Sequence, residues 1–203
     1  MNKGCVNKRA GVLVVSGVII WLVSLALQAE EYVSQEAFLS KAFGGKAPSN
    51  QTLWLQADHK KAAQTILGHG YSGLRVRYWQ QGSKTAWILH EIGKERPIRI
   101  GVVLKSTELD KNTVSKKAHI TASPKPEIES VTILAFEESR GWEVRYPFFT
   151  QQFEGVSLKS DRSLTESIDG ITGATLSVRA VTNTARLALY FHQVVHSNQV
   201  ARK

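Results

Sequence analysis

Cysteine and proline are scarce in this sequence of 203 residues, which holds one Cys and five Pro. The single cysteine, Cys5, excludes an intrachain disulfide, a paired-cysteine metal site and a CxxCH haem attachment site. It precedes the apolar segment, whereas the lipid-bearing cysteine of a lipoprotein follows one. With 42% hydrophobic and 21% charged residues, the composition is that of a globular protein and excludes collagen-like or low-complexity chains.

Acidic residues are absent from residues 1–29, and the whole chain carries a net charge of +9. Lys3, Lys8 and Arg9 supply three of these charges, which leaves +6 for the rest. A positive balance favours acidic partners or anionic lipid surfaces, although a solvated basic surface is the simpler explanation. The basic residues form no single stripe with interleaved aromatics, so the sequence does not favour nucleic-acid binding.

Residues 1–29 are predicted to be an export segment. The stretch from Ala10 to Leu27 contains 18 residues without a charge and follows a basic N-terminus. This length lies between that of a signal peptide core, about 7–15 residues, and that of a spanning helix, about 17–25. Leu27-Gln28-Ala29 is a possible cleavage site. Because basic residues stay in the cytoplasm, we expect the rest of the chain on the other side, periplasmic after cleavage or anchored by residues 10–27.

Apolar spacing and turn residues predict a mixed set of elements after this segment. Helices are predicted at 33–43, 58–67 and 175–195, with Asp58 as the N-cap of the second and a helical turn at 148–153. Strands are predicted at 73–80, 84–91, 98–104, 128–136 and 142–146. Residues 44–52 and 105–117 are predicted to be loops.

The order of these elements predicts the fold class. Strands come in a run and helices lie mostly at the ends, which is typical of α+β folds rather than of alternating βαβ units. We expect a small antiparallel sheet packed with helices, with the longest helix at the C-terminus. We expect the chain to have three regions: the segment 1–29, a helical extension over 30–64, and one domain over 65–203.

The turn before the last helix is the most informative string, Asp169-Gly-Ile-Thr-Gly-Ala-Thr-Leu-Ser177. Thr172 is a candidate N-cap, which would put Thr175 in the first helical turn. Gly173 allows a ligand to come close to the backbone. The first amides of a helix lack intrahelical acceptors, and with the helix dipole they favour a bound anion. Many helices begin this way for capping alone, so the turn by itself leaves both explanations open.

The same string resembles the flavinylation motif of the FMN-binding domain family, D-x-x-[ST]-G-A-T-x-[ST]. This family includes the periplasmic flavin subunits of the Rnf and Na+-translocating NADH:quinone reductase complexes. All of the constrained positions match: Asp169, Thr172, Gly173, Ala174, Thr175 and Ser177. The resemblance implies that Thr175 carries FMN through a phosphoester bond, attached by a Mg-dependent flavin transferase that uses FAD as the donor.

Three upstream strings extend the resemblance to about residues 65–195. They are Gly70-Tyr-Ser-Gly73, Glu138-Ser-Arg-Gly141 and Gln152-Phe-Glu-Gly155. The family pattern implies that Glu138, Ser139 and Gly141 lie near the isoalloxazine ring. Arg140 departs from that pattern, which usually has Pro, and could place a positive charge near the flavin. Among the aromatic residues, Phe153 and Trp142 are the candidates to stack on the ring.

The resemblance implies an extracytoplasmic electron-transfer flavoprotein rather than a stand-alone enzyme. Its partners would be the flavin transferase during maturation and a membrane or periplasmic redox partner, such as a cytochrome or a quinone-linked complex. A periplasmic FMN-dependent reductase with a small-molecule substrate is an alternative, and so is a non-redox binding module that kept the fold. No acid, base or nucleophile is implied for turnover.

The histidines have simpler explanations than metal binding. His192 and His196 are four residues apart on the predicted last helix, a spacing that can bind a metal, but no third ligand is evident nearby. His69, His90 and His119 are isolated in the sequence. We therefore predict no metal site.

Overall fold

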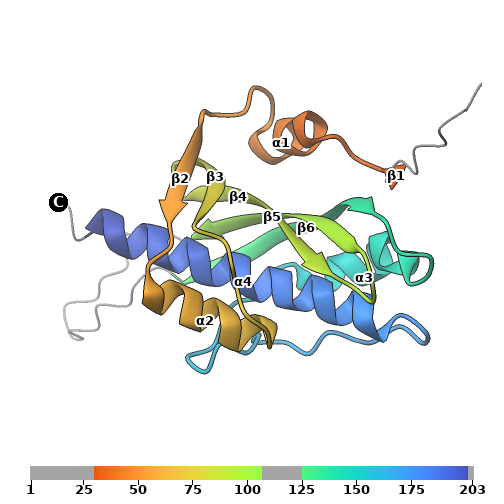
Figure 1. The fold of residues 1–203 in the computed structure, drawn as a ribbon. Coiled ribbons are helices and arrows are strands. Elements are labelled where there is room, and N and C mark those ends of the chain that lie inside the picture. The colour runs from red at the N-terminus through yellow and green to blue at the C-terminus, as the bar shows by residue number, and fades with distance from the viewer. Residues whose placement is uncertain (1–29, 107–124, 201–203) are drawn as a thin grey trace, which may run out of the picture.

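A computed structural model describes residues 30–106 and 125–200. Its centre is a six-stranded sheet in the order β1-β6-β5-β4-β3-β2, in which every neighbouring pair is antiparallel (Figure 1). The strands are β1 (Glu30–Glu31), β2 (Asn50–Trp54), β3 (Arg75–Gln81), β4 (Lys84–Ile92), β5 (Pro97–Ser106) and β6 (Pro126–Phe136).

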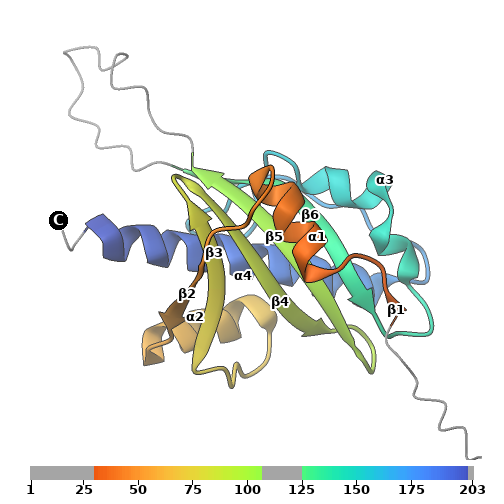
Figure 2. The same ribbon diagram turned by 90° about the horizontal axis from the view of Figure 1, so that it is seen from above.

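Helices cover both faces of the sheet. The long α4 (Thr175–Val200) and α2 (Ala57–Leu67) lie on one face, and α1 (Gln35–Phe43) lies on the other (Figures 1 and 2). After β6 come three short helical segments, η1 (Trp142–Arg145), α3 (Pro147–Thr150) and η2 (Gln151–Phe153). The α+β class, the antiparallel sheet and the long C-terminal helix that the sequence predicts are confirmed.

The main core lies between the sheet and α4. The helix and the residue before it bury mostly small side chains against the strands, among them Ala174, Val181, Ala185, Ala188 and Val195. These are members of the apolar face that the sequence predicts, and the sixth member, Val178, packs against the core while partly buried. Small side chains let the helix axis approach the sheet closely, so the position of its first turn is held by the packing of the turns that follow.

A second, smaller core lies under α1. Phe38, Leu39 and Ala42 of this helix pack on Trp79 and neighbouring residues of the sheet. The Phe38 ring occupies the space that a side chain would need at Gly101 of β5, because a Cβ there would be 2.6 Å from two ring carbons. The glycine therefore lets α1 seat directly on the middle of the sheet.

Most predicted elements are confirmed, with corrections at four places. Residues 142–146 form the 3-10 helix η1 and not a strand. Residues 30–64 contain β1 and β2 in addition to two helices, so the predicted loop 44–52 ends where β2 begins at Asn50. The second helix has Gln56, not Asp58, at its N-cap. Lys105 and Ser106 belong to β5, and the remainder of the predicted loop 105–117 lies beyond Ser106, mostly outside the described residues.

The predicted export segment, 1–29, also lies outside the described residues. Among residues 30–106 and 125–200, none of the helices combines the length and the apolar character that a membrane crossing needs.

Candidate functional site

The last helix begins at Thr175, directly after a tight turn. The N–H of Ala174 donates to the carbonyl of Ile171 at 2.9 Å, and Gly173 has φ +83°. The first helical hydrogen bond runs from the N–H of Val178 to the carbonyl of Ala174, also at 2.9 Å. Ala174 thus occupies the N-cap position, and the predicted cap, Thr172, is two residues too early. The prediction that Thr175 lies in the first turn is confirmed.

An alanine at the N-cap leaves the start of the helix without a side-chain acceptor. The amides of Thr175, Leu176 and Ser177 precede the first helical hydrogen bond, so the helix offers them no carbonyl. They lie at the positive end of a 26-residue helix. The Thr175 residue is exposed, while Ser177 is buried. This helix start can therefore accept an anion, which the dipole alone would favour by about 0.3–1 kcal/mol.

A cavity of about 570 Å³ lies beside this helix start. One wall comes from the helix and its turn, and the other comes from the loop after β6 and the β4–β5 turn. The lining residues are Lys94, Glu138, Ser139, Arg140, Gly173, Ala174, Thr175, Leu176 and Ser177. The fold thus brings Glu138 and Ser139 to the same cavity as Thr175, although more than thirty residues separate them. Lys94 and Arg140 add two positive charges to its wall.

Gly141 fixes how closely the two walls approach each other. Its φ is +88°, a conformation that glycine adopts without strain. A Cβ at this position would overlap the Oγ of Ser177 and lie 3.1 Å from its Cβ. Gly141 and Ser177 are both buried, so the contact between them closes the space behind the cavity.

Glu138 has a definite partner in the structure, the turn between β4 and β5. Its Oε1 accepts hydrogen bonds from the backbone N–H groups of Lys94, Glu95 and Arg96, at 2.5, 2.7 and 2.8 Å. Partial burial raises the pKa of this carboxyl group, but the three amides and the Lys94 charge outweigh burial and leave the pKa below its ordinary value of 4.5. Glu138 is therefore an ionised carboxylate that ties the loop after β6 to the β4–β5 turn.

Asp169 and Thr172 lie outside this cavity. Both are exposed, and neither is among the residues that line it. The N–H of Asp169 donates to the Oε1 of Gln152 at 2.7 Å, so Gln152 holds the turn that leads into α4. In the Gly70–Gly73 string, the Tyr71 ring packs edge-on against Phe191, with the ring centroids 6.1 Å apart. Gln152 therefore positions backbone and Tyr71 packs against the core, and neither string, Gln152–Gly155 or Gly70–Gly73, lines the cavity.

The two aromatic candidates for stacking on the flavin do not line the cavity. Phe153 is fully buried and packs edge-on against Phe149, with the ring centroids 5.5 Å apart. Trp142 is partly exposed and packs against Tyr146. Phe153 cannot stack on a ligand without leaving the core, so that interpretation is wrong. None of the nine lining residues is aromatic.

Lys94 is the lining residue that sequence reasoning missed. It belongs to the stretch Gly93-Lys-Glu-Arg96, which connects two predicted strands and has no recognisable motif. It lies at the cavity because the backbone amides of its turn donate to Glu138, which holds the turn in place. A hairpin turn can be predicted from the sequence, but the partner of its backbone amides cannot.

The histidine pair on α4 is part of the core. His192 is 1% exposed, and its ring nitrogens lie 2.7 Å from the hydroxyls of Thr85 and Ser106. Burial and the neighbouring His196 lower its pKa to about 3, so the ring is neutral. No group of three or more His, Cys, Asp or Glu side chains suited to a metal occurs in the described part of the chain. His69 is not isolated, since its Nε2 lies 2.7 Å from the Oε1 of Glu91.

Comparison with known families gives one result. Residues 115–190 match the model of the FMN-binding domain. In the described part, the match includes β6, the loop with Glu138, and the first sixteen residues of α4, and therefore every lining residue of the cavity except Lys94. None of the curated proteins matches the chain.

Proposed function

We propose that this chain, whose residues 115–190 match the model of the FMN-binding domain, carries FMN on Thr175 through a phosphoester bond and transfers electrons outside the cytoplasm. One observation carries the proposal: an exposed threonine lies at the uncapped start of a long helix, on the wall of a cavity lined by two cations, Lys94 and Arg140, and one carboxylate, Glu138. The matched family supplies the cofactor, and the geometry supports the position of the bond.

The attachment reaction needs only groups that Thr175 and a flavin transferase with FAD supply. The Thr175 Oγ attacks the phosphorus of the FMN half of FAD, and the bond from that phosphorus to the bridging oxygen breaks. AMP leaves with the bridging oxygen, and the hydroxyl proton is released. No electron is transferred in this step. Because Thr175 is exposed, its hydroxyl is accessible to a separate enzyme.

The lining residues suit the phosphate end of FMN. A phosphodiester on Thr175 would lie next to the free amides of the first turn, and Lys94 and Arg140 on the opposite wall balance its charge. The cavity volume, about 570 Å³, lies within the range of roughly 300–1,000 Å³ that is usual for small-molecule sites. Gly173, which is exposed and has no side chain, keeps the backbone accessible near the bond.

Flavin supplies the redox chemistry, and the residues of this chain retain and position it. A covalent bond removes the dissociation equilibrium, which matters for a protein in a dilute compartment outside the cytoplasm. The uncharged stretch 10–27 behind basic residues supports that location. The redox partner would be a membrane or periplasmic protein, such as a cytochrome or a quinone-linked complex.

Mass spectrometry of the protein produced together with a flavin transferase tests the bond. We expect a peptide containing Thr175 that is heavier by FMN less one water, and yellow protein whose absorbance survives denaturation. Thr175→Ala should abolish the adduct while costing at most about 1 kcal/mol of stability. Thr175→Ser keeps a hydroxyl and tests whether the nucleophile alone suffices.

The matched control is Thr65→Ala, because Thr65 is an exposed threonine of α2 that lies outside both the motif and the cavity. This variant should fold as the wild type does and should keep the adduct on Thr175. An unmodified Thr175 peptide in the wild-type protein, with the transferase shown to be active on another substrate, would contradict the proposal.

A further inference from the structure

The sheet divides between β3 and β4. The two strands pair from Gln81 and Lys84 at the hairpin turn only as far as Tyr78 and Trp87. Beyond this point β3 pairs with β2 alone, and β4 pairs with β5 alone, so the strands separate as Figure 2 shows.

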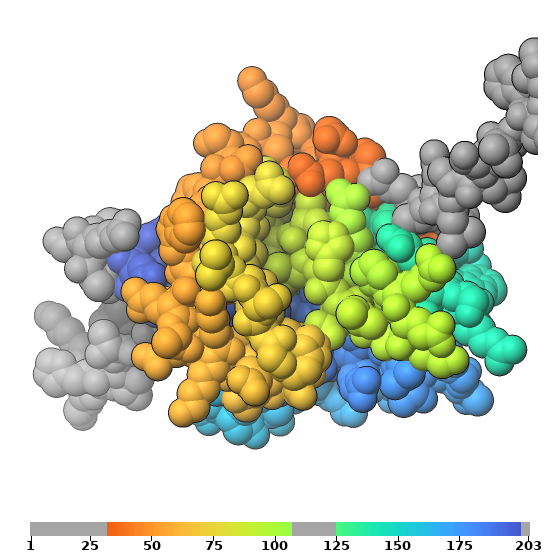
Figure 3. Space-filling model, in the orientation of Figure 1, coloured from red at the N-terminus to blue at the C-terminus, as the bar shows by residue number. Residues whose placement is uncertain are grey.

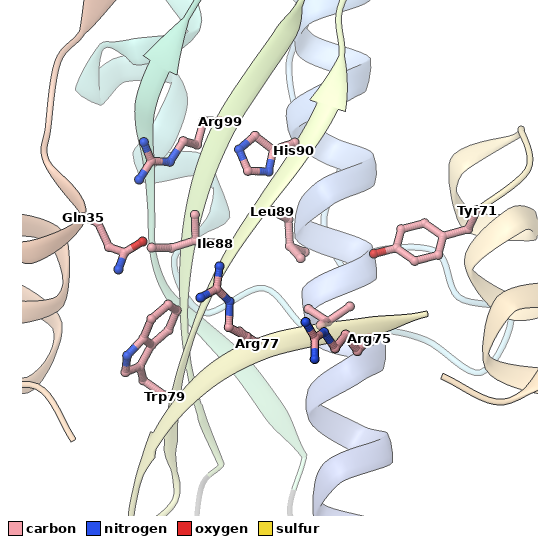
Figure 4. A pocket seen from close by; sticks show the side chains of 10 residues that line it. Gln35, Tyr71, Arg75, Arg77, Trp79, Ile88, Leu89, His90 and Arg99 are labelled. Atoms are coloured by element: carbon pink, nitrogen blue, oxygen red, sulfur yellow. The ribbon is translucent and has the colours of Figure 1, made fainter. Parts of the chain in front are cut away.

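The fork holds a cavity of about 440 Å³. In the space-filling view a hollow separates the yellow atoms of β3 from the yellow-green atoms of β4 and β5 (Figure 3). Residues from α1, the loop before β3 and three strands line it: Gln35, Tyr71, Arg75, Val76, Arg77, Trp79, Ile88, Leu89, His90 and Arg99 (Figure 4). The cavity shares no lining residue with the one at Thr175.

The charge of this fork cavity is positive. Arg75 and Arg77 extend from β3 and Arg99 extends from β5, while no carboxylate lines the cavity (Figure 4). Within residues 30–106 and 125–200, neither Arg75 nor Arg77 forms an ion pair with a carboxylate. Arg75 packs over the ring of Trp54, with its guanidinium carbon 5.7 Å from the centroid. Two exposed guanidinium groups are thus available on one strand.

His90 adds a neutral polar group to the same wall. Partial burial and the charge of Arg99, which is opposite His90 in the β4–β5 register, lower the pKa of His90, although Glu137 nearby acts in the other direction. The cavity therefore carries three permanent positive charges at neutral pH. Arg75 and Arg77 are two residues apart on the same face of β3 and repel each other, and a bound anion would offset that repulsion.

The chemistry of the wall defines the class of ligand. A guanidinium group presents planar N–H donors that match phosphate oxygens in pairs, and Gln35 and Tyr71 add polar groups. Trp79 and Ile88 add apolar side chains to the lining. We propose that the fork between β3 and β4 is a binding site for a small organic phosphate, whose phosphoryl oxygens contact Arg75, Arg77 and Arg99 and whose organic part lies on Trp79 and Ile88.

Isothermal titration calorimetry of the full chain in a nonionic detergent, with inorganic pyrophosphate and phenyl phosphate as probes, tests this proposal. We expect saturable binding at one site. Arg75→Gln combined with Arg77→Gln should weaken it at least tenfold, and the double Lys variant, which keeps charge without the planar donors, should fall in between. Both side chains are exposed, so folding should be retained, as circular dichroism would verify.

Two single variants serve as controls. Arg96→Gln removes an exposed arginine at the β4–β5 turn, and Arg140→Gln removes one that lines the cavity at Thr175. Neither should change the affinity by more than twofold. Loss of binding in Arg140→Gln with none in the β3 variants would assign the anion to the helix start and overturn the proposal. An equal loss in all variants, or no saturable binding in the wild type, would also overturn it.

Discussion

Gly141 shows how a single residue without a side chain shapes the proposed flavin site. Its backbone conformation and its contact with Ser177 both exclude a Cβ. The contact joins the loop after β6 to the first turn of α4, so the two walls of the cavity depend on it. The family pattern implies that Gly141 lies near the ring, and in the structure it packs against Ser177 without lining the cavity.

We predict that Gly141→Ala destabilises the protein by about 1–3 kcal/mol, since the substitution adds backbone strain and an overlap. Urea unfolding followed by tryptophan fluorescence measures this. Replacing Ser177 with Ala as well removes the overlapping hydroxyl and should recover part of the loss, while the strain from the positive φ remains. A double variant no more stable than Gly141→Ala would show that the contact with Ser177 contributes nothing.

At the scale of residues, positions set by neighbouring residues in the sequence could be predicted, and positions set by contacts with distant residues could not. Thr175 was assigned to the first turn of α4 because the turn and the helix are contiguous in the sequence. The N-cap was misassigned to Thr172, because cap preference favours threonine over alanine while the turn geometry decides which residue closes it. The position of Lys94 beside the cavity could not be predicted, because it depends on a hydrogen bond to Glu138, 44 residues away in the sequence.

The β4–β5 turn is an element whose order depends on a carboxylate from elsewhere in the chain. Glu138 accepts three consecutive backbone amides, and a Cβ at Gly93 would lie 2.8 Å from its Oε1. We predict that Glu138→Ala costs about 1–3 kcal/mol, because it leaves these amides without their acceptor. Glu138→Gln keeps an acceptor oxygen and should cost less.

The contribution of Glu138 also depends on pH. Since its folded pKa lies below 4.5, the stabilisation is complete above that pH and is lost as the pH falls through the lowered folded value. Thermal unfolding at pH 7 and at pH 3.5 should therefore show a smaller gap between wild type and Glu138→Ala at the lower pH. Glu137→Ala is the control, because none of these three amides donates to Glu137. A gap independent of pH would contradict this account.

Helices and strands with strong apolar patterns could be predicted from the sequence. Those that form only through contacts with other parts of the chain could not. The four central strands follow alternation or continuous apolar runs that the sequence shows directly. Strand β2 is mostly polar and forms as an edge partner of β3, so no pattern within it reveals a strand. Residues 142–145 alternate as a strand would, but Gly141 at positive φ and Pro147 enclose them in a turn.

Across the whole molecule, His192 connects the sheet to the long helix. It joins α4 to Thr85 on β4 and to Ser106 at the end of β5, and Trp87 donates its indole N–H to the Thr85 hydroxyl at 2.8 Å. The buried ring is neutral in the folded protein. Unfolding exposes it to water, where its pKa returns to about 6.5.

We predict that the free energy of unfolding falls as the pH drops from 6.5 towards 3, by up to about 1.4 kcal/mol per pH unit from this ring. The stabilisation is complete above pH 6.5, because only the unfolded chain takes up the proton below that value. Urea unfolding at pH 7.5, 5.5 and 4.5 measures the slope. His192→Asn should be less stable at pH 7.5 but should show a shallower slope, and an equal slope in both proteins would refute the role.

The two-residue strand β1 has a consequence for how far the protein could travel. Glu30 pairs with Phe136, and Glu138 follows two residues later, about 7 Å along the strand direction. Only two residues separate Leu27 from Glu30, a chain length that spans at most about 11 Å. If residues 10–27 remain in a lipid bilayer, this short linker keeps the Thr175 cavity within a few nanometres of the lipid surface. Encounters with membrane-bound partners would then be a search in two dimensions, whereas cleavage after Ala29 would free the carrier to diffuse.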